Sequence, residues 1–312
     1  MLRLKLDPWS ADYGPSLHFE PEEACAEVDT SVEGEWRAHS LAAGPLPESV
    51  ILIDGVRRMD LFLRWEDQAR SLPAAAGSLA VGALLLRPGT SLPLSQSLPE
   101  VVVEQLLLLA GSADSEPPRW PGLRSLFVGE QQQDLMRGLQ DQMRQQEALL
   151  ASRLSGAYDL VLADGPLQST HQLNEADVLG YIKSHHRPLL APAEMDLVWQ
   201  LKPGQRTPLF SLGAASYRRL SWYQRLESPR PGETVMAGVV RLEMMAGGGV
   251  ARAQHRAQQV GALLPHVRNF RHRDPRAPQN LIPIAVLERI LRHRLGEPSL
   301  VQRRLKMKLL GG

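Results

Sequence analysis

Two short stretches decide the fold of this chain: VILIDG at residues 50–55 and YDLVLADG at residues 158–165. Each is an apolar run that stops at Asp-Gly, which is the pattern of a buried strand followed by a turn. A carboxylate at the C-terminal end of such a strand points toward the crevice where open α/β sheets place their sites. Asp54 and Asp164 are therefore candidate site residues. The plain alternative is an ordinary turn-capping Asp in front of Gly.

Glu147 is a third candidate. Residues 133–155 have apolar side chains at steps of three or four, which predicts an amphipathic helix. Glu147 occupies a position of the inward stripe where the pattern calls for an apolar side chain, and a buried Glu is rare unless it is paired or binds a metal. The alternative is a solvated Glu at the border of that stripe. The other members of the stripe are Met136, Leu139, Met143, Leu150 and Leu154.

The order of the predicted elements indicates an α/β fold. Three strands with short links come first, then the long helix, then a strand ending at Asp164, which is the order of the ribonuclease H-like core. We expect a mixed five-stranded sheet flanked by helices. The predicted strands are 49–54, 58–67, 78–87, 158–164, 209–212 and 235–243, a helix precedes Lys183, further helices cover 251–264 and 282–295, and residues 101–110 fit either type.

Three segments follow from this pattern. Residues 1–45 are rich in acids and prolines and are predicted to be an N-terminal extension. Residues 46–298 are predicted to form the main α/β domain with a helical C-terminal part, and residues 299–312 a basic tail.

Composition is that of an ordinary globular protein, with 43% hydrophobic and 22% charged residues in a chain of 312. No apolar run is long enough to span a membrane, the N-terminus lacks the pattern of a signal peptide, and Cys25 is the sole cysteine. We therefore expect a cytoplasmic protein without disulfides or a cysteine zinc site.

The charge is distributed unevenly. Residues 251–312 carry 13 Lys and Arg against three acids, although the whole chain has a net charge of +1. Such a basic segment suits a polyphosphate backbone and predicts nucleic acid as a partner. The alternative is an Arg-rich face that balances an acidic neighbour in a dimer.

At this point the motifs resemble the NurA nuclease family, in particular a bacterial subgroup. The similarity covers residues 46–300 and includes IDG at 53–55, Glu147 ahead of LADGPL at 162–167, GYIK at 180–183, VRLE at 240–243, GQRTPLF at 204–210, SWY at 221–223 and DPRAPQNL at 274–281. The resemblance implies a ribonuclease H-like fold, a homodimer, Mn²⁺-dependent DNA cleavage, a HerA-like hexameric translocase as partner, and a role in processing DNA ends during recombination repair. Archaeal members carry a further metal-site His in a C-terminal helix, and Asn280 or Glu288 is the candidate replacement here.

The predicted chemistry is phosphodiester hydrolysis with two divalent ions, Mn²⁺ or Mg²⁺, which activate water and stabilise the leaving oxygen. Asp54, Glu147 and Asp164 are the expected ligands, with Asp54 bridging and Asn280 as a fourth ligand. Candidate contacts to nucleic acid are Lys183, Arg206 and Arg276; the alternatives are a solvated Lys183 and arginines that form ion pairs across a dimer. Glu243 beside Arg241 is either a site residue or part of a cross-strand ion pair.

Two other hypotheses stay open. The chain could be a catalytically weak adaptor that keeps the fold to bind DNA and an ATPase ring, or an enzyme of the same fold that acts on RNA. Metal titration distinguishes the adaptor from a nuclease, and competition between DNA and RNA substrates distinguishes the RNA-acting enzyme from a deoxyribonuclease.

Overall fold

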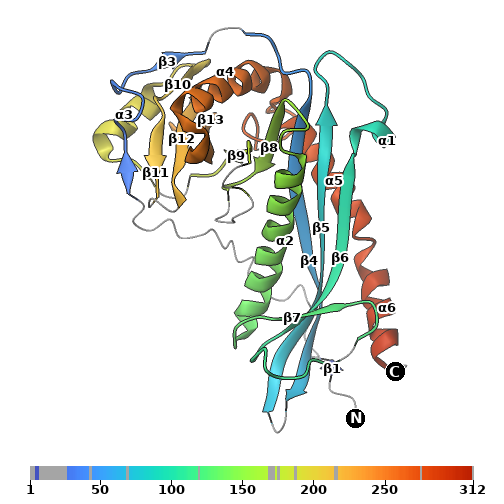
Figure 1. Ribbon diagram of the computed structural model, residues 1–312. Helices are drawn as coiled ribbons and strands as arrows, with labels where there is room; N and C mark the ends of the chain where they lie inside the picture. Colours follow the sequence, from blue (N-terminus) through green and yellow to red (C-terminus); the bar gives the residue numbers. More distant parts are fainter. Residues whose placement is uncertain are drawn as a thin grey trace.

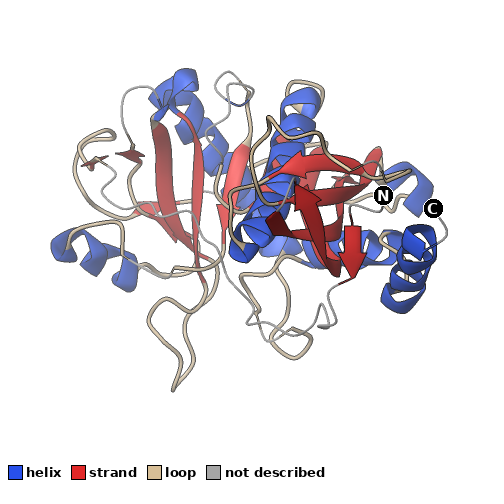
Figure 2. Ribbon diagram, turned by 90° about the horizontal axis from the view of Figure 1, so that it is seen from below, coloured by secondary structure: helices blue, strands red, loops and turns tan. Residues whose placement is uncertain are grey.

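The computed structural model describes residues 4–6, 27–41, 44–67, 70–118, 120–167, 173, 176–185, 188–213, 217–274 and 276–310. These residues form a mixed α/β structure in which helices pack on both faces of one large sheet (Figures 1 and 2). Cys25 and most of the predicted N-terminal extension lie outside the described residues.

The sheet contains thirteen strands in the described part of the chain, so the expected five strands are only its centre. The strands are β1 (Leu4–Leu6), β2 (Val28–Asp29), β3 (His39–Ser40), β4 (Val50–Asp67), β5 (Arg70–Leu86), β6 (Glu100–Leu109), β7 (Arg124–Phe127), β8 (Leu160–Asp164), β9 (Leu179–Ile182), β10 (Gln205–Arg206), β11 (Phe210–Leu212), β12 (Arg219–Arg225) and β13 (Val239–Met245). Their main order is β2-β11-β12-β13-β9-β8-β4-β5-β6-β7, with β1 beside β4, and β10 between β12 and β3.

Six α-helices and a short 3₁₀ helix are described. They are α1 (Leu94–Ser97), α2 (Gln132–Leu154), α3 (Pro192–Gln200), η3 (Ala246–Gly248), α4 (Gly249–Val267), α5 (Ile282–Arg294) and α6 (Pro298–Leu310). The predicted helices at 133–155, 251–264 and 282–295 correspond to α2, α4 and α5. The segment predicted to be a basic tail forms α6.

The centre of the sheet follows the predicted order of three strands, a helix and a strand. β4, β5 and β6 are antiparallel neighbours. The chain then passes through α2 and returns as β8, which pairs in parallel with β4 and sets Ile53 beside Ala163. Because both strands run in the same direction, Asp54 and Asp164 follow this last pair at the same level of the sheet.

Two predicted strands, 49–54 and 58–67, are in fact one strand of 18 residues, β4. It does not turn at Asp54-Gly55, because β5 pairs with it along its whole length. The register shifts between Met59 and Leu61, where Asp60 is an extra residue. The bulge reverses which residues face each side, so Met59 packs toward α2 while Leu61 packs toward α6.

Three further expectations change. The third strand of the meander is β6, residues 100–109, and the predicted strand at 78–87 is the second half of β5. The segment before Lys183 is the strand β9 rather than a helix. All four residues of β9 are buried, so the sequence shows no alternation by which to recognise it.

Helices cover the two faces of the sheet with separate apolar clusters. α2 packs on Ile51, Ile53 and their neighbours, whereas α4 packs on Val50, Leu52 and strands β8, β9, β12 and β13. α5 lies on β4 and β5 on the same face as α4, and α6 continues along the lower part of β4 (Figure 1). β4 is therefore held between α2 and α5 beside Asp54.

Glycines allow these helices to approach closely. A Cβ at Gly55 would lie 2.5 Å from Glu147 Oε1 and 2.8 Å from Met143 Cγ of α2. On the opposite face, a Cβ at Gly82 would lie 2.9 Å from Leu291 Cδ2 of α5. Gly82 pairs with Asp54, so both helices are drawn toward the same part of β4.

The described parts of residues 1–45 join the sheet as β1, β2 and β3. Among the described helices, none is long and apolar enough to cross a membrane.

Candidate functional site

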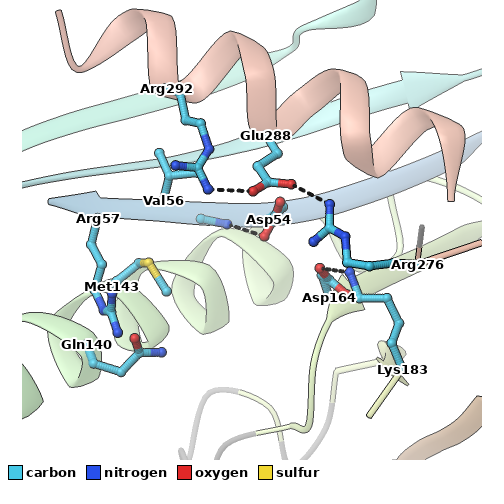
Figure 3. A pocket seen from close by; sticks show the side chains of 11 residues that line it. Asp54, Val56, Arg57, Gln140, Met143, Asp164, Lys183, Arg276, Glu288 and Arg292 are labelled. Atoms are coloured by element: carbon cyan, nitrogen blue, oxygen red, sulfur yellow. Dashed lines mark hydrogen bonds and ion pairs between the residues drawn. The ribbon is translucent and has the colours of Figure 1, made fainter. Parts of the chain in front are cut away.

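The candidate site lies where β8 ends and β4 continues. β8 stops at Asp164, and Gly165 follows with a φ of 105°, as the sequence predicts for a turn. β4 runs on beyond this level, so its edge borders a cavity of about 250 Å³ that reaches α2 on one side and α5 on the other (Figure 3). The lining residues are Asp54, Gly55, Val56, Arg57, Gln140, Met143, Asp164, Lys183, Arg276, Glu288 and Arg292.

Asp54 is 8% exposed at the base of this cavity. Its Oδ1 accepts a hydrogen bond from the Gly55 amide at 2.8 Å. Burial and the nearby Asp164 raise the pKa of Asp54 to about 8, although Lys183 and the Gly55 amide act in the opposite direction. Burial therefore disfavours the ionised form of Asp54, and a bound cation would offset this cost.

Asp164 lies beside Lys183, the first residue after β9. Lys183 Nζ donates to Asp164 Oδ2 at 2.6 Å and to Asn280 Oδ1 at 3.3 Å. The other oxygen, Asp164 Oδ1, is buried without a hydrogen-bond partner among the described residues. A buried carboxylate oxygen in this condition is costly, which marks a position where a cation or donor would be stabilising.

Glu147 approaches from α2 with a half-buried side chain. Its Oε1 lies against the main chain at Gly55, one residue after Asp54. Burial, followed by the charges of Asp54 and Asp164, raises the pKa of Glu147 well above its ordinary value, and Arg144 and Arg57 oppose this. Glu147 is thus electrostatically part of the same cluster, as the helix pattern predicts.

The mouth of the cavity carries a carboxylate between two arginines. Glu288 on α5 accepts from Arg292 at 2.7 Å and lies 3.6 Å from Arg276 (Figure 3). Both arginine side chains are more than half exposed, at 67% and 59%. Guanidinium groups of this kind can exchange a carboxylate partner for a phosphate.

The structure thus brings together most of the predicted site residues. Asp54, Asp164, Lys183 and Arg276 line one cavity, and Glu147 lies beside it. Asn280 is fully buried behind Lys183, and its Nδ2 donates to Asp274 at 2.6 Å.

Arg206 is not brought to this cavity. It is 2% exposed on β10, and its two terminal nitrogens each lie 2.7 Å from an oxygen of Glu33. A buried two-pronged ion pair of this kind holds the N-terminal segment on the sheet. This role replaces the expected contact with nucleic acid.

Glu243 forms a separate buried ion cluster. Arg219 and Arg241 lie 2.9 Å and 2.7 Å from its two oxygens. The ion-pair interpretation of Glu243 and Arg241 therefore agrees with the structure.

The donor set fits a divalent cation of the Mg²⁺ or Mn²⁺ type, because Asp54, Glu147 and Asp164 offer carboxylate oxygens and Asp164 Oδ1 has no partner within the described residues. The same residues do not yet converge as a set: the described chain holds no group of three His, Cys, Asp or Glu side chains arranged to bind a metal. Lys183 Nζ lies 2.6 Å from Asp164 Oδ2 and already holds that carboxylate.

The sequence analysis does not single out two polar lining residues, Arg57 and Gln140, and it includes Arg292 only within the basic segment 251–312. Arg57 could have been found by alternation, because it lies on β4 two residues after Gly55 and shares its face. Arg292 lies four residues after Glu288 on α5, the spacing of a helical ion pair.

Comparison with known proteins adds little. No protein-family model matches the sequence, and no curated protein matches it. Among solved structures, the chain is similar to the crystal structure of the NurA nuclease from Sulfolobus solfataricus, with a TM-score of 0.43 and 11% identity over 88% of this chain and 86% of that chain. A likeness this distant assigns neither an activity nor site residues to the chain.

Proposed function

We propose that this protein is a metal-dependent nuclease that hydrolyses phosphodiester bonds in DNA. The observation that carries the proposal is the cavity that Asp54 and Asp164 line, with Glu147 beside it, below a rim of arginines. We further propose that β6, β5, β4, β8 and β9 are the five strands of a ribonuclease H-like core. The strand directions and the α2 connection support this assignment.

A bound Mn²⁺ or Mg²⁺ would stabilise charge on the phosphate and make a water molecule more acidic. Asp54, Glu147 and Asp164 would supply carboxylate oxygens for that cation. Arg276 and Arg292, which now flank Glu288, would hold the phosphate of the bond to be cleaved. α2 and α5 fix these groups on rigid elements on both sides of β4.

DNA as substrate is supported by exposed basic residues that continue from the cavity along α5 and α6. Arg289 and Arg294 are exposed on α5, and Arg303, Arg304, Lys306 and Lys308 on α6. Other basic side chains of the C-terminal segment form ion pairs with acids of the same chain, for example Arg256 with Asp177 and Arg268 with Glu227. The exposed Lys and Arg side chains of α5 and α6 are therefore the ones best placed to contact the phosphate backbone of DNA.

The wider role follows from the resemblance of the sequence motifs. We propose that the protein acts at DNA ends as a cytoplasmic homodimer, together with a HerA-like hexameric ATPase, in end resection during recombination repair.

One observation favours a second candidate, a catalytically weak adaptor that binds DNA and a translocase ring. Lys183 holds Asp164, and the acids of the described chain do not form a ready metal-binding group. An adaptor would keep the basic surface and lose cleavage.

The test is incubation of labelled double-stranded DNA, single-stranded DNA and RNA with the purified protein in Mn²⁺, Mg²⁺ or EDTA. We expect DNA cleavage in Mn²⁺ that EDTA abolishes, and a loss of at least about 100-fold in Asp54→Asn, a magnitude typical of removing one essential group. Asp141→Asn is the matched control, because Asp141 is exposed on the same helix as Glu147.

Absence of cleavage with a HerA-like ATPase and ATP present would overturn the nuclease and leave the adaptor. Cleavage of RNA alone would contradict the proposal that DNA is the substrate and leave the nuclease activity standing.

A further inference from the structure

Resting on the proposed function, we infer that the ammonium group of Lys183 takes the place of one of the two expected metal ions. The site then binds a single divalent cation, for which Asp54, Glu147 and the unpartnered Oδ1 of Asp164 are the available ligands, while Lys183 holds the other Asp164 oxygen.

The position of Lys183 is the first support. Its Nζ lies 2.6 Å from Asp164 Oδ2, a distance at which a charged donor bonds strongly to a carboxylate. Asp164 ends β8 next to Asp54 on β4, which is where a second cation bridging the two acids would have to bind. The ammonium therefore occupies the Oδ2 side of Asp164 and leaves Oδ1 without a partner among the described residues.

Lys183 is held there by a chain of polar groups. Asn280 is fully buried, and its Nδ2 donates to Asp274 Oδ2 at 2.6 Å. This bond turns the amide oxygen of Asn280 toward Lys183, from which it accepts at 3.3 Å. Asp274 is fixed in turn by the Arg276 amide at 2.8 Å. These bonds make the amide oxygen of Asn280 a fixed acceptor for Lys183.

The charge of the cavity is the second support. Its lining holds four cationic side chains, Arg57, Lys183, Arg276 and Arg292, against the three acids Asp54, Asp164 and Glu288. Lys183 neutralises Asp164, and Glu288 is paired with Arg292 and Arg276. With the adjacent Glu147 counted, four cations face four acids, so each bound divalent ion adds two positive charges that no further lining side chain offsets, and this favours one ion over two.

Mn²⁺ binding, measured without DNA, tests the inference. The full-length chain is titrated with MnCl₂, and electron paramagnetic resonance reports both the unbound ion and any pair of bound ions that are magnetically coupled. We expect one bound Mn²⁺ per chain with an uncoupled spectrum. In Lys183→Gln we expect a second Mn²⁺ and a coupled spectrum, whereas Lys183→Arg, which keeps the charge, should still bind one.

Lys202→Gln is the matched control, because Lys202 is an exposed lysine outside the cavity, and it should behave as the unaltered chain. Circular dichroism confirms that each variant is folded. Two coupled ions in the unaltered chain, or a single ion in a folded Lys183→Gln variant, would overturn the inference and leave the nuclease intact. If the chain binds no Mn²⁺, or if Asp54→Asn binds Mn²⁺ as well as the unaltered chain, both the inference and the proposed nuclease activity would be overturned.

Discussion

Two buried carboxylates of this protein, Glu243 and Asp54, have opposite surroundings. Glu243 is fully buried on β13, and it accepts hydrogen bonds from Arg219, Arg241 and the Leu167 amide. Asp54 is nearly as buried, but the one hydrogen bond it receives within the described chain comes from the Gly55 amide. The sequence analysis places each at the end of a predicted strand, 49–54 for Asp54 and 235–243 for Glu243.

The difference separates a structural acid from a reactive one. A carboxylate whose oxygens already accept several hydrogen bonds has little capacity left for a ligand, and its removal takes the balancing charge away from buried cations. A carboxylate with few donors is unstable when ionised, so its pKa rises and it gains from any cation that binds. The following substitutions should therefore act on stability in opposite directions in the two regions.

The largest effect is expected from Glu243→Gln. It removes the charge between Arg219 and Arg241, and breaking a buried ion cluster typically costs about 3–5 kcal/mol. Urea unfolding should show this loss in the free energy of unfolding. Glu104→Gln is the control, because Glu104 pairs with the half-exposed Arg124, and it should change stability by less than about 1 kcal/mol. Equal losses in the two variants would contradict the structural role of Glu243.

Glu33→Gln is expected to follow, with an effect that depends on pH. Burial favours the neutral acid, but hydrogen bonds from Arg206, the Leu209 amide and Gln254 prevail and lower the pKa of Glu33 to about 2. A depressed pKa stabilises the folded protein above the ordinary value of 4.5, and this contribution is lost as the pH falls toward 2. The shift corresponds to about 3 kcal/mol at pH 7.

Unfolding of Glu33→Gln measured at pH 7 and pH 3 checks this expectation. The difference in the free energy of unfolding between Glu33→Gln and the unaltered protein should be smaller at pH 3 than at pH 7. Glu35→Gln serves as control, since Glu35 and its partner Arg37 are both largely exposed. A gap that stays constant between the two pH values would show that the Arg206 pair does not set the acid response.

The comparison also shows what the sequence could predict. Asp164 was found correctly as the last residue of a strand, because an apolar run and a positive-φ glycine are local signals. The partners of Glu243 and Arg206 were not predictable in this way. Arg206 meets Glu33 across 173 positions of sequence, and no local pattern reports such a contact.

Gly55 is needed for helix packing and not for the turn that the sequence predicts. Asp-Gly at 54–55 predicted a turn, yet β4 continues through it. The glycine is required by helix packing instead, because α2 places Glu147 and Met143 against its Cα. The bulge at Asp60 likewise reverses which residues of β4 face each side of the sheet. A search for uninterrupted alternation therefore divides this one strand into two.

Gly55→Ala tests that packing. The new methyl group would lie 2.5 Å from Glu147 Oε1 and 2.8 Å from Met143 Cγ, so α2 or these side chains must move. We expect a loss of about 1–3 kcal/mol in the free energy of unfolding and weaker Mn²⁺ binding. Gly44→Ala is the control, since a Cβ there meets nothing within 4 Å. Unchanged stability and Mn²⁺ affinity would show that Gly55 does not position Glu147.

Asp54→Asn should have the opposite sign. The folded-state pKa of Asp54, about 8, lies above its ordinary value of 3.8, so ionisation destabilises the folded protein increasingly as the pH rises through that window. Asn removes this cost, and we expect a gain of about 1–2 kcal/mol at pH 8 in EDTA that disappears near pH 4. Asp141→Asn should show no such gain. A loss of stability in Asp54→Asn at pH 8 would place Asp54 among the structural acids with Glu243.

The smallest effect is expected from Arg276→Gln at the rim of the cavity. Its guanidinium is 59% exposed and lies 3.6 Å from both Asp274 and Glu288, so folding depends little on it. If it holds a phosphate, DNA affinity in Ca²⁺ should fall by about 1 kcal/mol, and the slope of log affinity against log salt should decrease by about one. Arg37→Gln is an exposed control on the N-terminal segment. An unchanged salt slope would exclude Arg276 from the DNA path and restrict the functional charges to the buried part of the cavity, where Asp54 and Lys183 lie.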